Sequence, residues 1–183
     1  MMNRGVTLIE MLVVVSIIGI LAVALGFTYV GWQGAYKVER EIKSLYTDLM
    51  DARAMAMTRN RAFFADFPTA GSYRIIADTN GDGTRSNGDT IVVPPPPTIL
   101  PLTNQKTVEY AISSDIAGMP GAGTWITFDS RGLLSTEGAV CLTSTADPDY
   151  DCIVFRQTRI NMGKLTTQIS NGGVCNDANC VER

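Results

Sequence analysis

The chain of 183 residues contains no histidine, and neither sign of charge dominates it. Without imidazole, the chain cannot form Ser-His-Asp or Cys-His catalytic pairs, and metal sites that need a histidine ligand are excluded. The 18 acidic and 15 basic residues leave a net charge of −3, which argues against a generally basic nucleic-acid-binding protein. The pair Lys43 and Ser44 falls on the surface of a predicted helix, and no nucleophile–base pair stands out, so we do not expect an enzyme.

Residues 6–30 form an apolar segment in which Glu10 is the only charged residue. As an α-helix, these 25 residues are long enough to cross a bilayer. A charged carboxylate inside such a helix costs roughly 2.5–3.5 kcal/mol, so it normally has a partner and a function. Two simpler interpretations of the segment remain: a plain membrane anchor, and a signal peptide cleaved near Ala22-Val23-Ala24.

The sequence around Glu10 resembles the prepilin cleavage motif of type IV pilins and type II secretion pseudopilins. The resemblance rests on Gly5, on the run Thr7-Leu8-Ile9-Glu10 and on the unbroken apolar helix that follows, whereas Val6 replaces the phenylalanine that is commonest there. It implies that a prepilin peptidase cuts after Gly5 and methylates the new amino terminus on Val6. Residues 1–5 would then be the leader peptide, and residues 6–30 the transmembrane and filament-core helix.

The resemblance also implies a role for Glu10. The amine on Val6 and the Glu10 carboxylate of a neighbouring subunit would neutralise each other in a dry helix bundle and align the subunits. The alternative is that Glu10 extends to the lipid headgroups near the helix start. The implied location is the bacterial inner membrane, crossed once, with a periplasmic C-terminal domain, and afterwards a pilus or pseudopilus. The implied partners are other pilin or pseudopilin subunits, the prepilin peptidase and the inner-membrane assembly platform.

A second apolar pattern predicts that the helix continues through residues 31–61. Charged residues such as Glu39, Lys43 and Asp51 lie off this pattern, as expected for an amphipathic helix. The apolar stripe consists of Val38, Ile42, Leu45, Leu49, Ala52 and Ala56. We expect it to pack against a globular domain.

Residues 62–183 are predicted to form this β-rich domain, because runs of β-branched and aromatic residues alternate with turns rich in Gly, Asn, Asp and Pro. About seven strands are expected, at residues 63–67, 72–77, 90–93, 106–111, 124–128, 153–156 and 164–169. The prolines at 94–97 predict an extended surface loop. A long helix followed by strands predicts an α+β, pilin-like fold in which the helix packs on an antiparallel β-sheet.

Residues 125–132, with the sequence Trp-Ile-Thr-Phe-Asp-Ser-Arg-Gly, are similar to the Ile-x-Phe-x-x-x-Gly block of GspH/FimT-type minor pilins and pseudopilins. By residue chemistry alone, the last four of these residues predict a plain hairpin turn. The resemblance implies a minor subunit that primes or caps assembly, and both a type IV pilus and a type II secretion pseudopilus remain open.

The alternative function is DNA binding during DNA uptake, which FimT-type relatives suggest. In those relatives the role is linked to a Gly-Arg-x-Arg stretch near the C-terminus. This chain lacks that stretch and offers only Arg156, Arg159 and Lys164 in the corresponding region. DNA is therefore not the expected partner.

Four cysteines lie in the predicted exported domain, where thiols are oxidised to disulfides. Zinc binding is disfavoured, because there is no Cys-x-x-Cys spacing and no histidine. Three pairings are possible for four cysteines. We expect Cys141–Cys152 and Cys175–Cys180, because each of these bridges closes a short local loop.

An aspartate-rich segment at residues 78–89 follows the calcium-loop template D-x-[DN]-x-[DN]-G-x5-E, with aspartate in the final place. Alternate oxygen ligands at this spacing can converge on one Ca²⁺ ion. The flanking residues resemble strands instead of EF-hand helices, so a bare hairpin loop is the other interpretation. The predicted ligands are Asp78, Asn80, Asp82, the Thr84 carbonyl, Ser86 through a water, and Asp89. No other cofactor is expected.

Overall fold

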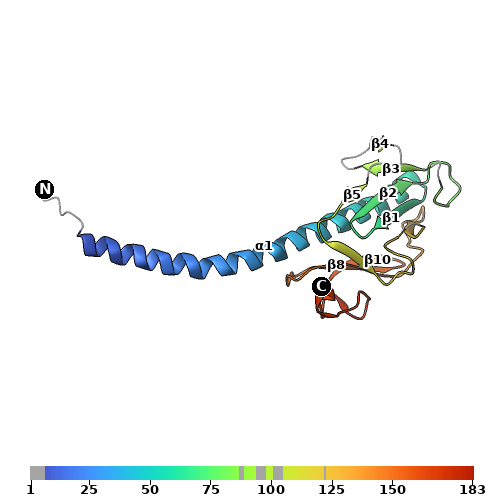
Figure 1. Ribbon diagram of the computed structural model, residues 1–183. Coiled ribbons are helices and arrows are strands. Elements are labelled where there is room, and N and C mark those ends of the chain that lie inside the picture. Colours follow the sequence, from blue (N-terminus) through green and yellow to red (C-terminus); the bar gives the residue numbers. More distant parts are fainter. Residues whose placement is uncertain (1–6, 87–88, 94–97, 101–104, 122) are drawn as a thin grey trace.

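The computed structural model describes residues 7–86, 89–93, 98–100, 105–121 and 123–183, and for residues 24–31, 90–93 and 98–100 it describes the backbone alone. One long helix extends well beyond a β-rich domain that packs on its C-terminal half (Figure 1). The predicted leader at residues 1–5, the predicted first mature residue Val6 and the prolines at 94–97 lie outside the described residues.

The helix α1 (Leu8–Arg59) is continuous over 52 residues, which corresponds to a length of about 78 Å. It begins where the Thr7 hydroxyl accepts the backbone N–H of Glu10, and it ends where Asn60 adopts a left-handed conformation with φ of 50°. Both are standard capping arrangements. No proline interrupts the segment, so the predicted single helix is confirmed.

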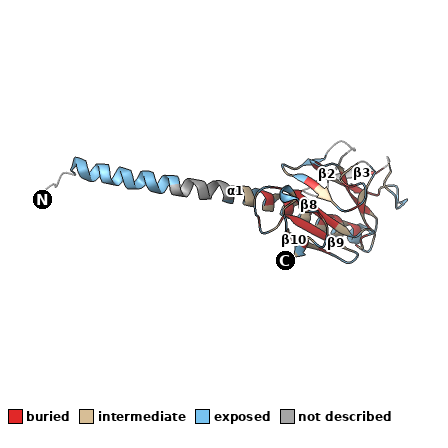
Figure 2. Cartoon of the chain, turned by 60° about the horizontal axis from the view of Figure 1, so that its bottom comes forward, coloured by how far each residue is buried: buried red, intermediate tan, exposed pale blue. Residues whose placement is uncertain are grey.

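The two halves of α1 have different surroundings (Figure 2). Side chains of residues 7–23 are exposed, and they include many large apolar groups. The predicted stripe in the second half is confirmed, because all six of its residues are at most 1% exposed. The described side chains of the apolar half, at residues 7–23, are therefore not covered by the described part of the subunit, whereas the stripe of the amphipathic half is part of the domain core.

Among the described residues, no helix combines the length and the apolar character that a membrane crossing needs. The crossing expected for residues 6–30 stays a prediction.

Two antiparallel sheets pack beside α1. The first has the order β4-β3-β2-β1-β7, with β5 also paired to β2. The second has the order β11-β10-β9-β8-β6. The first sheet consists of β1 (Phe63–Thr69), β2 (Ser72–Ala77), β3 (Thr90–Val93), β4 (Thr98–Leu100), β5 (Lys106–Thr107) and β7 (Trp125–Phe128). The second consists of β6 (Ala111–Ser114), β8 (Gly138–Thr143), β9 (Cys152–Arg156), β10 (Arg159–Leu165) and β11 (Cys180–Glu182), and a 3₁₀ turn spans Ile169–Asn171.

Two central strands of the second sheet, β8 and β9, are buried on both faces, because their residues alternate between two apolar clusters. In β9, Ile153 and Phe155 join the main core against α1, whereas Cys152 and Val154 face a smaller cluster under the C-terminal segment. This is the period-2 alternation of a strand. A strand buried on both faces lacks alternating polar residues, which is why the sequence pattern missed β8.

The described residues contain eleven strands, more than the seven expected. The single strand predicted for 106–111 is wrong, because the backbone N–H groups of Glu109 and Tyr110 donate to the Glu41 carboxylate at 2.8 and 3.2 Å. The strand predicted for 164–169 is also wrong: β10 ends at Leu165, and Asn179 then binds the backbone of Thr167. Long-range side-chain contacts end both strands.

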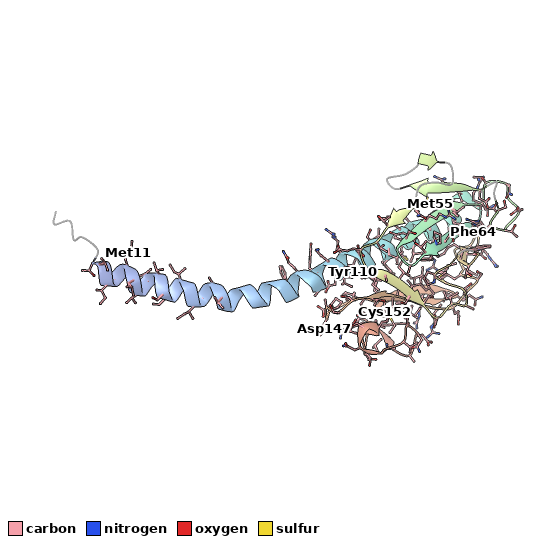
Figure 3. The ribbon with its side chains drawn as sticks, viewed as in Figure 1. Met11, Met55, Phe64, Tyr110, Asp147 and Cys152 are labelled. Carbon is pink, nitrogen blue, oxygen red and sulfur yellow. A yellow bond between two sulfur atoms is a disulfide. The ribbon has the colours of Figure 1, made fainter. Side chains whose placement is uncertain are left out.

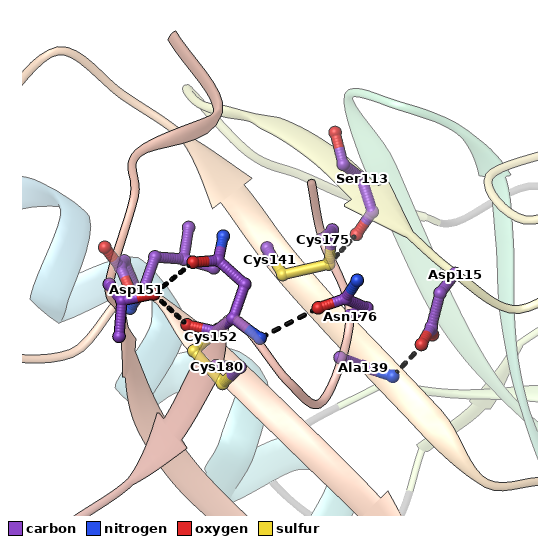
Figure 4. The surroundings of a disulfide bond; sticks show 12 residues. Ser113, Asp115, Ala139, Cys141, Asp151, Cys152, Cys175, Asn176 and Cys180 are labelled. Carbon is purple, nitrogen blue, oxygen red and sulfur yellow. Dashed lines mark hydrogen bonds between the residues drawn. A yellow bond between two sulfur atoms is a disulfide. The ribbon is translucent and has the colours of Figure 1, made fainter. Parts of the chain in front are cut away.

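The disulfide pairing expected from the sequence is wrong. The bridges are Cys141–Cys175 and Cys152–Cys180, with Cα–Cα distances of 5.8 and 6.1 Å (Figure 4). Cys141 and Cys152 are register partners in β8 and β9, and both face the smaller cluster, over which the C-terminal segment runs. Each therefore bonds to the segment that covers it instead of to its neighbour across the strands.

A glycine in the middle strand accommodates the second bridge. β10 lies between β9 and β11, so the Cys152–Cys180 bridge spans it, and Gly163 is the register partner of both Cys152 and Glu182. A Cβ atom at Gly163 would lie 2.8 Å from the Cys180 sulfur and 2.7 Å from the Val181 carbonyl oxygen. Only a residue without a side chain fits beneath this bridge.

We therefore expect Gly163→Ala to lower the free energy of unfolding by about 1–3 kcal/mol, since overpacking must displace β11 or the bridge. Urea unfolding under non-reducing conditions measures this. Gly71→Ala is the matched control, because a Cβ atom there meets nothing within 4 Å.

Non-reducing peptide mapping of the parent protein should recover Cys141–Cys175 and Cys152–Cys180, and a Cys141–Cys152 peptide would contradict the structure.

Candidate functional site

Glu10 lies in the first turn of α1, and its side chain is exposed. A carboxylate is favourable at this end of a helix because the unpaired N–H groups carry partial positive charge. Within the described part of the chain, the Glu10 carboxylate forms no salt bridge. No further charged residue occurs in the sequence before Lys37. Glu10 is thus an isolated charge at the start of an apolar surface.

That apolar surface is continuous around the first half of the helix. The side chains project outward on all sides, as the view around Met11 illustrates (Figure 3). The exposed fractions of Leu8, Ile9 and Ile20 are 83%, 71% and 72%. An apolar surface of this extent on a folded protein marks a contact with a membrane or with other chains.

Ser44 has a lysine neighbour that the sequence pattern did not indicate. The Lys106 ammonium lies 2.8 Å from the Ser44 hydroxyl and 2.8 Å from a carboxylate oxygen of Asp48, beside an open cavity of about 210 Å³. Both contacts of the Lys106 ammonium are therefore with side chains of α1. Burial and the same Asp48 raise the pKa of the Tyr73 hydroxyl. The contacts of Lys106 with Ser44 and Asp48 therefore link β5 to α1.

The aspartate-rich loop at residues 78–86 and Asp89 is held together by its own carboxylates. Asp78 is 3% exposed and accepts the backbone N–H groups of Gly81 at 2.6 Å and Gly83 at 2.9 Å. Asp89, also 3% exposed, accepts the N–H of Ser86 at 2.6 Å. Backbone N–H groups of the loop therefore bind carboxylates of the same loop.

The other predicted calcium ligands are used in the same way. The N–H and hydroxyl of Thr84 donate to Asp82 and hold the pKa of its carboxyl below the usual value. The Asn80 amide donates to Asp82 at 2.7 Å. In the described residues no three acidic or cysteine side chains are gathered as a metal site requires. A carboxylate oxygen can accept a hydrogen bond and still offer lone pairs to a cation, so calcium binding by this loop stays a prediction.

Arg85 connects this loop to the first sheet. Its guanidinium donates to the buried Asp66 at 3.0 Å and lies 5.7 Å from the centre of the Trp125 ring. Arg74 of β2 binds the same carboxylate at 2.6 Å. Two cations thus share one buried carboxylate, which fixes the base of the loop.

The cations considered for DNA binding are engaged within the domain. Arg156 pairs with Asp177 at 3.0 Å, and Lys164 pairs with Asp147 at 2.7 Å. Arg159 pairs with Glu182 at 3.4 Å. Their charges are balanced locally, so they do not form the uncompensated basic patch that binding to phosphates requires.

The block at residues 125–132 combines a strand and a turn. β7 pairs with β1, and Asp129 then accepts the backbone N–H groups of Arg131 and Leu133 at 2.9 and 2.8 Å. Gly132 has a φ of 76°, and a Cβ atom there would lie 2.9 Å from the Met57 side chain of α1. The predicted turn is confirmed, and it packs on the end of the helix.

We expect Asp78→Ala to lower the free energy of unfolding by about 1–3 kcal/mol even in the presence of a chelator, because two backbone N–H groups lose their acceptor. Asp51→Ala, at an exposed helix position, is the control. Equal stability of Asp78→Ala and the parent protein would contradict the capping role.

If the loop also binds calcium, the parent will melt at higher temperature in millimolar Ca²⁺ than in chelator, and the Asp78→Ala, Asp82→Ala double variant will not.

Comparison with known proteins gives two family matches, one over the start of α1 and one over its second half and much of the domain. Residues 1–26 match the prokaryotic N-terminal methylation motif, and residues 41–158 match the family described as type II transport protein GspH. No curated protein and no solved structure matches the chain.

These two matches cover the parts of the molecule that the geometry singles out. The first contains Glu10 and the exposed apolar half of α1, and it indicates a prepilin that is anchored in the inner membrane. The second contains the buried stripe from Ile42 onward, the aspartate-rich loop and the block at 125–132. Other pseudopilins and the prepilin peptidase are the partners that such a chain implies. Because the second match covers more than half of the chain, the protein belongs to the GspH family of type II secretion pseudopilins, which are structural and not enzymatic subunits.

Proposed function

We propose that this protein is a minor pseudopilin that primes or caps assembly of the type II secretion pseudopilus. The observation that carries the proposal is Glu10, a single exposed charge in a long apolar helix start. A carboxylate in this environment is costly unless a cation neutralises it. The mature amino terminus on Val6 of a neighbouring subunit is the cation that the prepilin motif would supply.

The division of α1 supports a role as an assembling subunit. The apolar stripe of its second half is buried in the core of the domain, so this face of the helix is not available to another chain. The side chains at residues 7–23 of its first half are exposed. We propose that residues 6–30 cross the inner membrane once, and that helices of other pseudopilins replace the lipid when the subunit enters the pseudopilus.

The domain would then lie in the periplasm, with the prepilin peptidase acting at Gly5 and Val6 and the assembly platform receiving the helix from the membrane. The two disulfides support this placement, because disulfides persist in oxidising compartments such as the periplasm. The described cations at 156, 159 and 164 are paired within the domain, so no observation favours DNA capture as a second function.

The proposal predicts a processed amino terminus. Intact-mass spectrometry of the native protein should show the loss of residues 1–5 and the gain of one methyl group on Val6. A chain that starts at Met1, or one cleaved after Ala24, would contradict the proposed maturation.

Glu10→Gln should prevent the subunit from joining the pseudopilus and leave membrane insertion intact. It removes a charge that the bilayer resists, but it also removes the partner of the neighbouring amine. Co-purification of the variant with other pseudopilins measures assembly, and flotation with membranes measures insertion. Glu109→Gln is the matched control, because that carboxylate is exposed on the domain and pairs with Lys37 of its own chain. Undiminished co-purification of Glu10→Gln would overturn the pairing role.

A further inference from the structure

Two aromatic residues are exposed on α1 just before the domain begins. Trp32 is 65% exposed and Tyr36 is 60% exposed, and their stacked rings have centroids 6.0 Å apart. They lie one helical turn apart. Gly34 lies between them in sequence but faces the domain, since a Cβ atom there would be 3.3 Å from the Cβ of Ala146. The aromatic pair therefore points away from the side of α1 that contacts the domain, and the described part of the subunit leaves both rings exposed.

The position of the pair along α1 matches the thickness of a bilayer. Trp32 follows Glu10 by 22 residues, which is about 33 Å along the helix axis. The hydrocarbon core of a bilayer is about 30 Å thick. With Glu10 at one boundary of the hydrocarbon, Trp32 would lie at the opposite boundary, and the first charged residue after Glu10, Lys37, would lie beyond it.

The chemistry of the two rings fits this boundary better than electrostatic attraction does. Indole and phenol rings combine an apolar body with a polar N–H or O–H group, and they are enriched where lipid headgroups meet acyl chains. Of the first three basic residues that follow in α1, two are engaged in ion pairs, Lys37 with Glu109 and Lys43 with Glu39. The helix therefore does not present a polybasic surface at this level.

We propose that Trp32 and Tyr36 form an interfacial anchor that binds the headgroup region of the outer leaflet of the inner membrane and sets the depth at which α1 is inserted. This inference rests on the proposed membrane insertion of residues 6–30. It adds a second fixed point to the helix, because Glu10 then marks one boundary of the bilayer and the aromatic pair marks the other.

Depth-dependent fluorescence quenching tests the anchor. The chain has two tryptophans, so Trp125→Phe leaves Trp32 as the only one. The full chain is placed in vesicles of phosphatidylethanolamine and phosphatidylglycerol that contain brominated phosphatidylcholine. We expect the largest loss of Trp32 emission when the bromines lie near the carbonyl end of the acyl chains, and a smaller loss when they lie near the methyl end.

The reverse order, equal quenching at both depths, or no quenching would overturn the proposal. Trp32→Phe with Trp125 retained is the matched control, because Trp125 packs on Phe64 in the domain and should not be quenched. Flotation of the same vesicles separates the two failures. A chain that floats with unquenched Trp32 overturns the anchor alone, and the pair would then contact a neighbouring subunit. A chain that does not float overturns the proposed insertion as well.

A second experiment tests the control of depth. Ser16→Trp reports the middle of the apolar half in a chain that also carries Trp125→Phe. With Trp32→Tyr, which keeps a ring of the same character, quenching of the reporter should be confined to the deep bromines. With Trp32→Ala and Tyr36→Ala together, both the deep and the shallow bromines should quench the reporter, because the helix can then shift along the bilayer normal. An unchanged quenching profile would overturn the anchoring role.

Discussion

The structure depends on the burial of one stripe of α1 against both sheets. Leu45 and Leu49 are at most 1% exposed and share a core with Phe63 of the first sheet and Phe155 of the second. Because the helix continues without a break into its apolar half, this packing also sets the direction in which that half leaves the domain. Packing of the stripe from Val38 to Ala56 thus orients the segment that we propose meets the membrane and other subunits.

Carboxylate side chains accept backbone N–H groups at several irregular segments of the chain. Glu41 accepts two N–H groups between β5 and β6, and Asp115 accepts the N–H of Ala139 at 2.7 Å. Asp151 is fully buried and accepts the N–H of Leu165 at 2.7 Å; burial raises the pKa of its carboxyl. Asp78 does the same in its loop. The acidic residues are therefore structural acceptors more than catalytic groups.

The outer face of the second sheet shows how the C-terminal segment is ordered. This segment contributes few large apolar side chains, and Val174 and Val181 are exposed. Two disulfides attach it to β8 and β9, and the four cysteines themselves form much of the small cluster beneath it. Covalent links thus supply the cover that a short polar segment could not provide by apolar burial alone.

The sequence by itself determined the features that depend on local periodicity and on short motifs. These are the single long helix, its buried stripe, the turn at 129–132, the oxidised cysteines and the prepilin-like helix start. Tertiary structure alone decided the disulfide partners, because Cys141 and Cys152 are close along the chain but are covered by a segment about 30 residues away. It also decided where β5 and β10 end and that Lys106 meets Ser44. Each of these outcomes depends on residues brought together from distant parts of the chain, which no local pattern of spacing or polarity records.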